Sequence, residues 1–471
     1  MAAPPSRLRT LVDTISQAVT ALEDAFAAAK QPYPSLNAPF NPTSPGEVLF
    51  HQAEVAEAVD AILFASSALS ASVGAPQLRT VRTALGFTAS AAMRVAIDGC
   101  VAEILREHPH GLHYKDIAER NGLEPGKLAR ILRKLASVHI FSEVSPDVFA
   151  NNRLSSVLDT EKSVLELQTE CAISFFRSEG IASFVHHLTD TLFKGAAFLS
   201  EDLADPEYGK EDIGEKAPVP YAFKTPLSLY DWFEQPGNEK RLACFSAAMR
   251  AQTVALQTSD VILQGFDFAS LPPGSKIVDV AGGIGHVAMS IAKRHPKLHF
   301  VIEERPAVLE KAKKFWDEEL PEACLEFIPQ DFFEPQVVKD ARVFLLFHIM
   351  HNWGKTRAVQ ILRNLREVAS PETKLIIGDQ IVPHASSQQL AVGRGANVKG
   401  TESILSRISP ALAPGRAEHG ASLDMIMLIG LNGEERTFSG FVDLVEAGGW
   451  SIIEVHHSPG AFDSHIVAKP A

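Results

Sequence analysis

Basic residues and paired cysteines are scarce in this chain, and each shortage excludes a class of protein. Its 471 residues include 44 Lys and Arg against 57 Asp and Glu, a net charge of −13. Because a nucleic-acid surface needs clustered positive charge, this balance argues against nucleic-acid binding. The four cysteines contain no CxxC pair. We therefore expect neither a disulfide framework nor a zinc site, and the cysteines suit a reducing compartment.

Long apolar runs are missing as well. No stretch of about 18 consecutive apolar residues occurs, and the start, MAAPPSRLRTLVDT, has no apolar signal core. A mean hydropathy of +0.03 and 46% apolar residues are typical of a globular protein. We therefore expect a cytoplasmic protein without membrane contact, and its length predicts two or three domains.

A glycine-rich turn between two predicted strands is the most informative motif. Residues 277–304 read IVDVAGGIGHVAMSIAKRHPKLHFVIEE, which predicts a strand, a glycine turn, a helix and a second strand that ends at Glu304. Glycines let the backbone approach a ligand, and an acid roughly 20 residues later can accept hydrogen bonds from ribose hydroxyls. The motif predicts a site for the adenosine part of a cofactor, either a dinucleotide or S-adenosylmethionine.

The turn alone leaves that choice open, because residues 283–288 (GIGHVA) also satisfy the dinucleotide pattern. Two features favour S-adenosylmethionine. Asp279, at the end of the first strand, would repel a pyrophosphate but suits the cationic methionine end of that cofactor. The predicted strands 451–456 and 464–468 are too close for a helical crossover, so they must form an antiparallel hairpin, as in the seven-stranded methyltransferase sheet.

Strands and helices alternate from Ser275 onward, with earlier strands expected near 276–280, 299–303, 325–328, 342–347 and 373–379. Asp331 follows the third of these and could accept a hydrogen bond from an adenine amino group, although a turn or N-cap role is the alternative. The pattern predicts an α/β fold whose C-terminal part is a Rossmann-like seven-stranded sheet, mostly parallel with the last strand antiparallel.

The part of the chain before residue 265 is predicted to be mostly helical. An amphipathic helix at 8–30 and an Ala-rich, aliphatic helix at 48–74 flank a Pro-rich linker. Their apolar surface could be buried within the chain or against a second subunit. Residues 92–158 have winged-helix organisation, for which an acidic wing favours dimerisation or a lid over DNA reading. Its predicted helices are Met93–Leu105, Tyr114–Asn121 and Leu128–Val138, followed by strands at Phe141–Glu143 and Val148–Ala150.

His351 lies just past the carboxyl end of the fourth strand, where catalytic groups sit in open α/β sheets. A lone loop histidine is more often structural, but Met350 and Trp353 could shield this one from water. Asp379 and Glu435 could reach it from other loops, and a carboxylate orients an imidazole and stabilises its protonated form. This set suits removal of a proton from a phenol, since methyl transfer from a sulfonium needs little beyond alignment.

Together these motifs resemble the plant caffeate/isoflavone-type O-methyltransferase family, in particular its fungal branch acting on polyketide and other aromatic phenols. The resemblance spans roughly residues 92–471 and is carried by VDVAGGIGHVAMSIAKRHP, PQDFFEP, HIMHNW and DMIMLIGLNGEERTFSGFVDLVEAGGW. It implies S-adenosylmethionine as cofactor, a phenolic substrate and a homodimer with intertwined N-terminal domains. No metal is expected, because the histidine makes a Mg²⁺ site unnecessary.

The resemblance also implies a role for individual residues. The general base is His351, bracketed by Asp379 and Glu435. The predicted cofactor-binding residues are Asp279, Gly282, Gly283, Gly285, Glu304, Asp331 and Phe332. The predicted substrate-pocket residues are Phe176, Met249, Met350, Asn352, Trp353 and Met427. The expected segments are a helical extension at 1–90, a winged-helix dimerisation domain at 91–160, a helical linker with pocket residues at 161–265 and the cofactor-binding domain at 266–471.

Several positions depart from the family pattern. Ala281 replaces a glycine of GGGxG, Asn352 the aspartate of HDW, Glu304 the aspartate of DLP, and Phe347 a basic residue four positions before the histidine. The stretch 384–421 is also longer and richer in Gly and Ser. None of these removes a group that the reaction requires. The alternatives are a cofactor-binding interaction protein without turnover, a winged-helix regulator and an NAD-dependent oxidoreductase.

Overall fold

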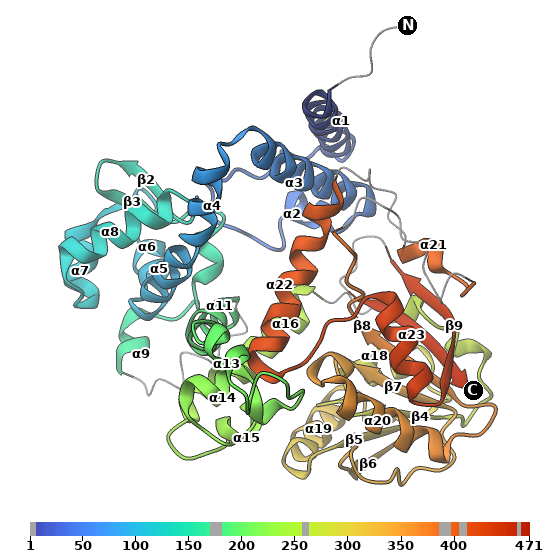
Figure 1. The fold of residues 1–471 in the computed structure, drawn as a ribbon. Helices are drawn as coiled ribbons and strands as arrows, with labels where there is room; N and C mark the ends of the chain where they lie inside the picture. The colour runs from blue at the N-terminus through green and yellow to red at the C-terminus, as the bar shows by residue number, and fades with distance from the viewer. Residues whose placement is uncertain (1–5, 170–180, 257–262, 386–396, 405–411, 459–462) are drawn as a thin grey trace, which may run out of the picture. The chain divides into compact units, whose positions relative to one another are not determined.

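The computed structural model describes residues 6–169, 181–256, 263–385, 397–404, 412–458 and 463–471. The chain forms two compact units, residues 1–199 with 221–256 and residues 200–220 with 257–471. Figure 1 labels their elements. The four-segment division made from the sequence stays a prediction.

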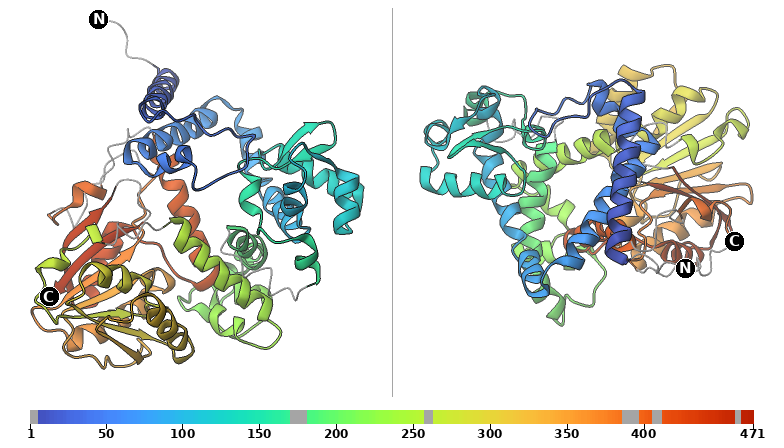
Figure 2. Two further views of the ribbon diagram at one scale, coloured as in Figure 1. Left: turned by 180° about the vertical axis from the view of Figure 1, so that it is seen from behind. Right: turned by 90° about the horizontal axis from the view of Figure 1, so that it is seen from above.

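The first unit begins with helices that share a small core. α1 (Arg7–Ala28) packs along α3 (Ala53–Val73) through Phe26 and Val55 (Figures 1 and 2). The linker between them holds α2 (Pro45–Val48) and η1 (Leu49–His51), and α4 (Pro76–Ala84) follows. By length and composition alone α3 could cross a membrane, and 17% of its most apolar window is buried. Such a helix is weak evidence for a span, since core helices pass the same test.

The next segment contains the predicted helices and strands with one correction. The single helix expected over Met93–Leu105 is wrong: α5 (Phe87–Asp98) and α6 (Val101–Arg106) are separate, because Cys100 adopts a left-handed φ of 48°. α7 (Tyr114–Asn121) and α8 (Pro125–Ala136) follow, with a three-stranded antiparallel sheet in the order β1 (Leu112–His113), β3 (Val148–Ala150), β2 (Ser142–Ser145). Arg133 of α8 is paired with Asp147 of the β2–β3 turn.

The remaining elements before the large sheet are helical. In the first unit α11 (Ile181–His187) packs on α16 (Glu239–Leu256), where Cys244 Sγ lies 3.2 Å from His186 Nδ1. Burial raises the pKa of Cys244 to about 12, so this thiol stays protonated and unreactive. The elements are η2 (Ser155–Leu158), α9 (Val164–Thr169), α11 (Ile181–His187), a π-helical turn η3 (Leu188–Leu192), α12 (Phe193–Ala196), α13 (Leu199–Ala204), η4 (Gly214–Lys216), α14 (Pro218–Phe223), α15 (Leu229–Phe233), α16 (Glu239–Leu256) and η5 (Phe268–Ser270).

The second unit is built on a seven-stranded sheet in the order β6-β5-β4-β7-β8-β10-β9. Neighbouring strands from β6 to β8 are parallel, and β10 runs antiparallel to both β8 and β9. This confirms the predicted fold class and the terminal hairpin. The strands are β4 (Lys276–Val280), β5 (His299–Glu304), β6 (Leu325–Pro329), β7 (Val343–Phe347), β8 (Lys374–Asp379), β9 (Trp450–His457) and β10 (Ser464–Pro470).

Alternate side chains of the central strands enter two cores, one on each face of the sheet. Ile277 and Leu345 pack with α18 (His286–Arg294) and α19 (Pro306–Glu319). Phe344 and Leu346 pack on the other face with α20 (Lys355–Val368) and α23 (Phe438–Ala447). Both faces are therefore covered, as a parallel sheet requires. The other elements are η6 (Met350–Asn352), α21 (Thr401–Ile404) and α22 (Ala413–Leu431).

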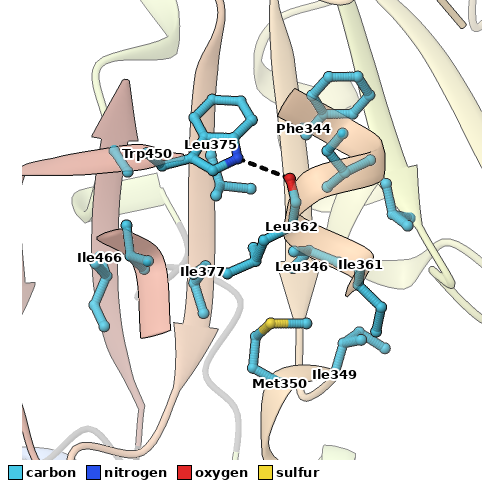
Figure 3. Close-up of a cluster of buried hydrophobic side chains, with 14 of the residues drawn as sticks. Phe344, Leu346, Ile349, Met350, Ile361, Leu362, Leu375, Ile377, Trp450 and Ile466 are labelled. Carbon is cyan, nitrogen blue, oxygen red and sulfur yellow. Dashed lines mark hydrogen bonds between the residues drawn. The ribbon is translucent and has the colours of Figure 1, made fainter. Parts of the chain in front are cut away.

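Leu362 of α20 lies at the centre of the second of these cores. It is fully buried, and its carbonyl oxygen accepts a hydrogen bond of 2.9 Å from Trp450 Nε1 (Figure 3). A Cβ on Gly448, at the end of α23, would lie 2.5 Å from the Leu362 Cβ. This close approach leaves the surrounding core little freedom to move into a cavity.

We expect Leu362→Ala to destabilise the second unit by about 3 kcal/mol, because it removes buried methyl groups and leaves a cavity. Leu203→Ala is the matched control: Leu203 is 53% exposed on α13, and the same truncation there should change stability by less than about 0.5 kcal/mol. Thermal unfolding of both variants measures the difference. Equal melting temperatures would contradict the packing described.

Candidate active site

The glycine turn after β4 is shaped around the carboxyl group of Asp279. A Cβ on Gly282 would lie 2.5 Å from Asp279 Cγ, so a side chain at position 282 would fill the space against the carboxyl group. Asp279 is 1% exposed, and its Oδ2 has no hydrogen-bond partner among the described residues. Burial, with a smaller contribution from Glu304 and Glu303, raises the pKa of Asp279 to about 7. A cationic group placed at this turn would supply the missing partner.

Glu304 closes the other side of the turn. Its Oε2 accepts a hydrogen bond of 3.2 Å from the Gly283 amide, so the acid predicted to hold a ribose lies directly on the glycine turn. Gly285 starts α18 with φ 79°, and a Cβ there would lie 2.5 Å from Trp316 Nε1. Ala281 also takes a left-handed φ of 54°. The alanine that departs from the family pattern therefore adopts a conformation typical of glycine, at a modest energetic cost.

Asp331 and Phe332 lie beyond the end of β6. Asp331 Oδ1 accepts a hydrogen bond of 2.9 Å from the Phe333 amide, which is the turn role considered as its alternative. The Phe332 ring packs edge-on against Trp353 with centroids 5.8 Å apart. This contact joins the predicted adenine side of the site to the histidine loop.

His351 lies on η6, past the carboxyl end of β7, and is hydrogen-bonded to a buried acid. Its Nδ1 is 2.8 Å from Glu435 Oε1, and the two side chains are 16% and 3% exposed. Burial alone would lower the pKa of His351, but the Glu435 hydrogen bond and the charge of Asp379 outweigh it, so its pKa is raised. With Glu435 ionised, Nδ1 donates the hydrogen and Nε2 is left as the acceptor.

Asp379 ends β8 beneath this pair. It is fully buried, and neither of its oxygens has a hydrogen-bond partner among the described residues. Burial raises its pKa to about 7, an effect that His351 partly offsets. The three predicted catalytic residues His351, Asp379 and Glu435 are therefore brought together.

A buried arginine holds the histidine loop in place. Arg436 is 2% exposed, and its guanidinium donates to the carbonyl oxygens of Met350 and Trp353, both at 2.7 Å. The Glu434 amide donates to the His351 carbonyl at 2.9 Å. The Arg436 side chain thus fixes the backbone on both sides of His351. Arg436 falls within the GEERTFSGF motif, but its sequence position alone does not predict this role.

Two further site residues were missed: His348 and Asp463, which form a hydrogen bond of 2.9 Å. The His348 ring stacks on His351, with centroids 5.7 Å apart and an angle of 29°. The spacing HIMH was the one available signal, because histidines three residues apart can meet on a helical turn. Asp463 follows the hairpin turn, and nothing in its local sequence marks it.

The predicted substrate-pocket residues have varied surroundings. Met350 is fully buried in the core. Asn352 is half-buried and donates through Nδ2 to the His348 carbonyl at 2.8 Å. Trp353 and Met427 are also half-buried, in the η6 loop and α22. Met249 lies on α16 of the first unit, and Phe176 falls outside the described residues.

The residues of the glycine turn fit S-adenosylmethionine. The unpartnered, buried Asp279 oxygen faces space that only a glycine at 282 leaves open, and this suits a cationic methionine group. Within the part of the chain that the structure describes, no group of three or more His, Cys, Asp or Glu side chains is placed to hold a metal ion.

Comparison with known proteins identifies the family. Residues 81–161 match the O-methyltransferase dimerisation domain and residues 210–396 the O-methyltransferase domain. An O-methyltransferase of Armillaria gallica is 38% identical over 99% of this chain and 100% of its own length. The 4-O-methyltransferase 1 of Phanerochaete chrysosporium is 34% identical over 99% of this chain and 100% of its own length. The chain belongs to the O-methyltransferase family and is an S-adenosylmethionine-dependent methyltransferase.

Solved structures share the fold at lower identity. The mitomycin 7-O-methyltransferase MmcR has a TM-score of 0.62 at 21% identity, covering 86% of this chain and all of that one. LepI, solved in complex with S-adenosylmethionine, has a TM-score of 0.65 at 17% identity, covering 98% of this chain and all of that one. These likenesses support the seven-stranded sheet together with the helical N-terminal part.

Glu303, the neighbour of Glu304, is a buried acid that its sequence position does not predict. It is 1% exposed and accepts a hydrogen bond of 2.9 Å from Gln336 Nε2. Burial raises its pKa to about 7, although the Gln336 hydrogen bond lowers it in part. Because the folded-state pKa exceeds the unfolded value, the folded protein binds this proton more tightly. The folded protein therefore loses stability as the pH rises from the pKa of Glu303 in the unfolded chain to its pKa in the folded protein.

We expect Glu303→Gln to remove the loss of folding stability that accompanies a rise in pH. The variant should match the wild type at about pH 5 and be more stable by on the order of 2 kcal/mol at about pH 8. Melting temperatures at both pH values measure the effect, with Glu318→Gln on the exposed face of α19 as control. A stability difference that is the same at both pH values would show that Glu303 is ionised throughout.

Proposed function

We propose that this enzyme methylates a phenolic hydroxyl of an aromatic, polyketide-like secondary metabolite, with His351 as general base. The observation that carries this proposal is the hydrogen bond of 2.8 Å between His351 Nδ1 and Glu435, at the carboxyl end of β7 and above the buried Asp379. An oriented imidazole with Nε2 available as acceptor is what removal of a phenolic proton requires.

In this proposal one group of residues binds the cofactor and another transfers the proton. When bound, S-adenosylmethionine supplies an activated methyl group on a sulfonium. Asp279 and the glycine turn would hold its methionine end, and Glu304 its ribose. Asp331 and Phe332 would bind the adenine. His351 Nε2 would take the proton from the substrate oxygen, and Glu435 and Asp379 would stabilise the resulting imidazolium.

The relatives support methyl transfer to oxygen. Two proteins of Phanerochaete chrysosporium with 34% and 28% identity are named as 4-O- and 3-O-methyltransferases. For the aromatic substrate, the support comes from the rings around the histidine loop, where Trp353 lies 4.8 Å from Phe333 between centroids. Within the second unit we include Met350, Asn352, Trp353 and Met427 in the proposed pocket, and Met249 and Phe176 stay predictions from the sequence.

A homodimer in the cytosol is the proposed assembly. The match of residues 81–161 to a dimerisation domain supports it. α4 and its C-cap residue Leu85 overlap the start of that segment and expose Leu78, Val81 and Leu85. We propose that the winged-helix unit at 91–160 serves this dimer rather than nucleic acid, since its Arg133 is paired with Asp147. The helical extension, pocket linker and cofactor-binding domain at 1–90, 161–265 and 266–471 complete the proposed division.

The test is turnover by the His351→Ala variant. Wild-type enzyme is screened with S-adenosylmethionine against mono- and dihydroxylated benzoates, benzaldehydes and anthraquinones, with product detected by mass. For the best phenol, kcat should fall by about 10²- to 10⁴-fold in the variant, because a general base is lost. Binding of S-adenosylhomocysteine, measured by calorimetry, should be unchanged.

His299→Ala is the matched control. His299 is also paired with an acid, its Nε2 lying 2.9 Å from Glu326 Oε1, but it lies at the opposite, amino end of its strand. It should keep wild-type turnover. If His351→Ala also kept wild-type kcat, His351 would not be the base. Binding of S-adenosylhomocysteine without turnover of any phenol would favour the cofactor-binding interaction protein instead.

A further inference from the structure

His348 is held rigidly beside His351 by hydrogen bonds from three directions. Its amide donates to the Gly378 carbonyl at 2.9 Å, and its own carbonyl accepts from Asn352 Nδ2 at 2.8 Å. These bonds fix a left-handed φ of 53°, which a histidine adopts only at an energetic cost. The ring is oriented by Asp463, 2.9 Å from its Nε2. Such over-determined strain is typical of functional positions.

The hydrogen bond to Asp463 makes His348 a cation. Burial alone would lower the pKa of His348, but the charge and hydrogen bond of Asp463 outweigh it and raise the pKa to about 9. The same pairing lowers the pKa of Asp463 despite its burial. At neutral pH the pair is therefore an imidazolium with a carboxylate.

The positive charge of His348 opposes the effect of the neighbouring acids on the pKa of His351. A general base must be unprotonated at the working pH, yet Glu435 and Asp379 both favour the protonated form of His351. The stacked His348 ring, with centroids 5.7 Å apart, opposes them. His348 also affects His286, at the start of α18; burial first and His348 second lower the pKa of His286 to about 4, so it stays neutral. The charge of His348 also offsets in part the rise that burial causes in the pKa of Asp379.

We propose that the His348–Asp463 pair is a positioning element of the catalytic site, whose positive charge, stacked on the His351 ring, opposes the protonation that Glu435 and Asp379 favour and so widens the pH range in which His351 can accept the substrate proton. The inference rests on the proposed function, because it concerns the protonation of the proposed base. Asp463 acts through His348, and His348 acts through His351.

The test removes the positive charge without removing the base. His348→Asn is the first variant, because asparagine tolerates the left-handed backbone. Asp463→Asn is the second, and it should leave His348 neutral. In either variant the His351 midpoint, followed by NMR of ¹³C-labelled histidine and assigned with His351→Ala, should rise by about 1 to 2 pH units, as removal of a charge at this distance predicts.

Turnover of the best phenol in the panel should change in parallel. The acid limb of the pH profile of kcat/KM should move upward by the same shift, so that activity at neutral pH falls about 10-fold or more and recovers at high pH. His348→Lys, which keeps the charge, should move the limb back toward the wild type. His299→Asn, at the distant His299–Glu326 pair, should change neither readout.

An unchanged His351 midpoint in a folded His348→Asn or Asp463→Asn protein would overturn the proposal. So would a uniform loss of rate at every pH, which is what a purely structural role predicts. If His351→Ala kept full turnover, the proposed base would be wrong, whereas the NMR titration would still decide whether His348 controls the protonation of His351.

Discussion

The site depends on one buried interaction, the double hydrogen bond from the Arg436 guanidinium to the carbonyl oxygens of Met350 and Trp353. These bonds hold the histidine loop against the segment that carries Glu435 and Arg436. Because His351 lies between Met350 and Trp353, the Glu435 carboxylate is brought to the His351 ring. Gly433 completes the junction, because any Cβ there would collide with the His351 carbonyl. Two segments more than 80 residues apart thus form one rigid support for a single side chain.

Around this support the protein buries more ionisable groups than stability alone would favour. Asp279, Glu303 and Asp379 are each at most 1% exposed, and burial raises the pKa of each to about 7. Buried acids of this kind destabilise the folded state at neutral pH unless a cation approaches them. Asp279 and Asp379 lie at the carboxyl edge of the sheet; His351 and His348 face Asp379, and the proposed cofactor would bring its cationic methionine end to Asp279. The cost of burying Asp279 and Asp379 therefore arises at the proposed cofactor and catalytic positions.

The sequence predicted the sheet more completely than the site. Strand β4 begins and ends where it was expected, because an apolar run before a glycine turn permits little else, and the β9–β10 hairpin followed from its short connection. The break at Cys100 was not predictable, since a left-handed cysteine follows from packing rather than from periodicity. Likewise His351 and Asp379 could be grouped because each follows a parallel strand, and Glu435 was added as an acid in another loop. Asp463, by contrast, meets His348 only through the three-dimensional path of the hairpin.

The most direct measurement is a crystal structure of the enzyme with S-adenosylhomocysteine. We expect the methionine end of this ligand at the Asp279–Gly285 turn and its ribose at Glu304. His351 Nε2 should face the sulfur across a space that admits one flat hydroxylated ring. An imidazole turned into the packed interior, or a nucleoside bound away from the glycine turn, would contradict the assignment of His351 as the base.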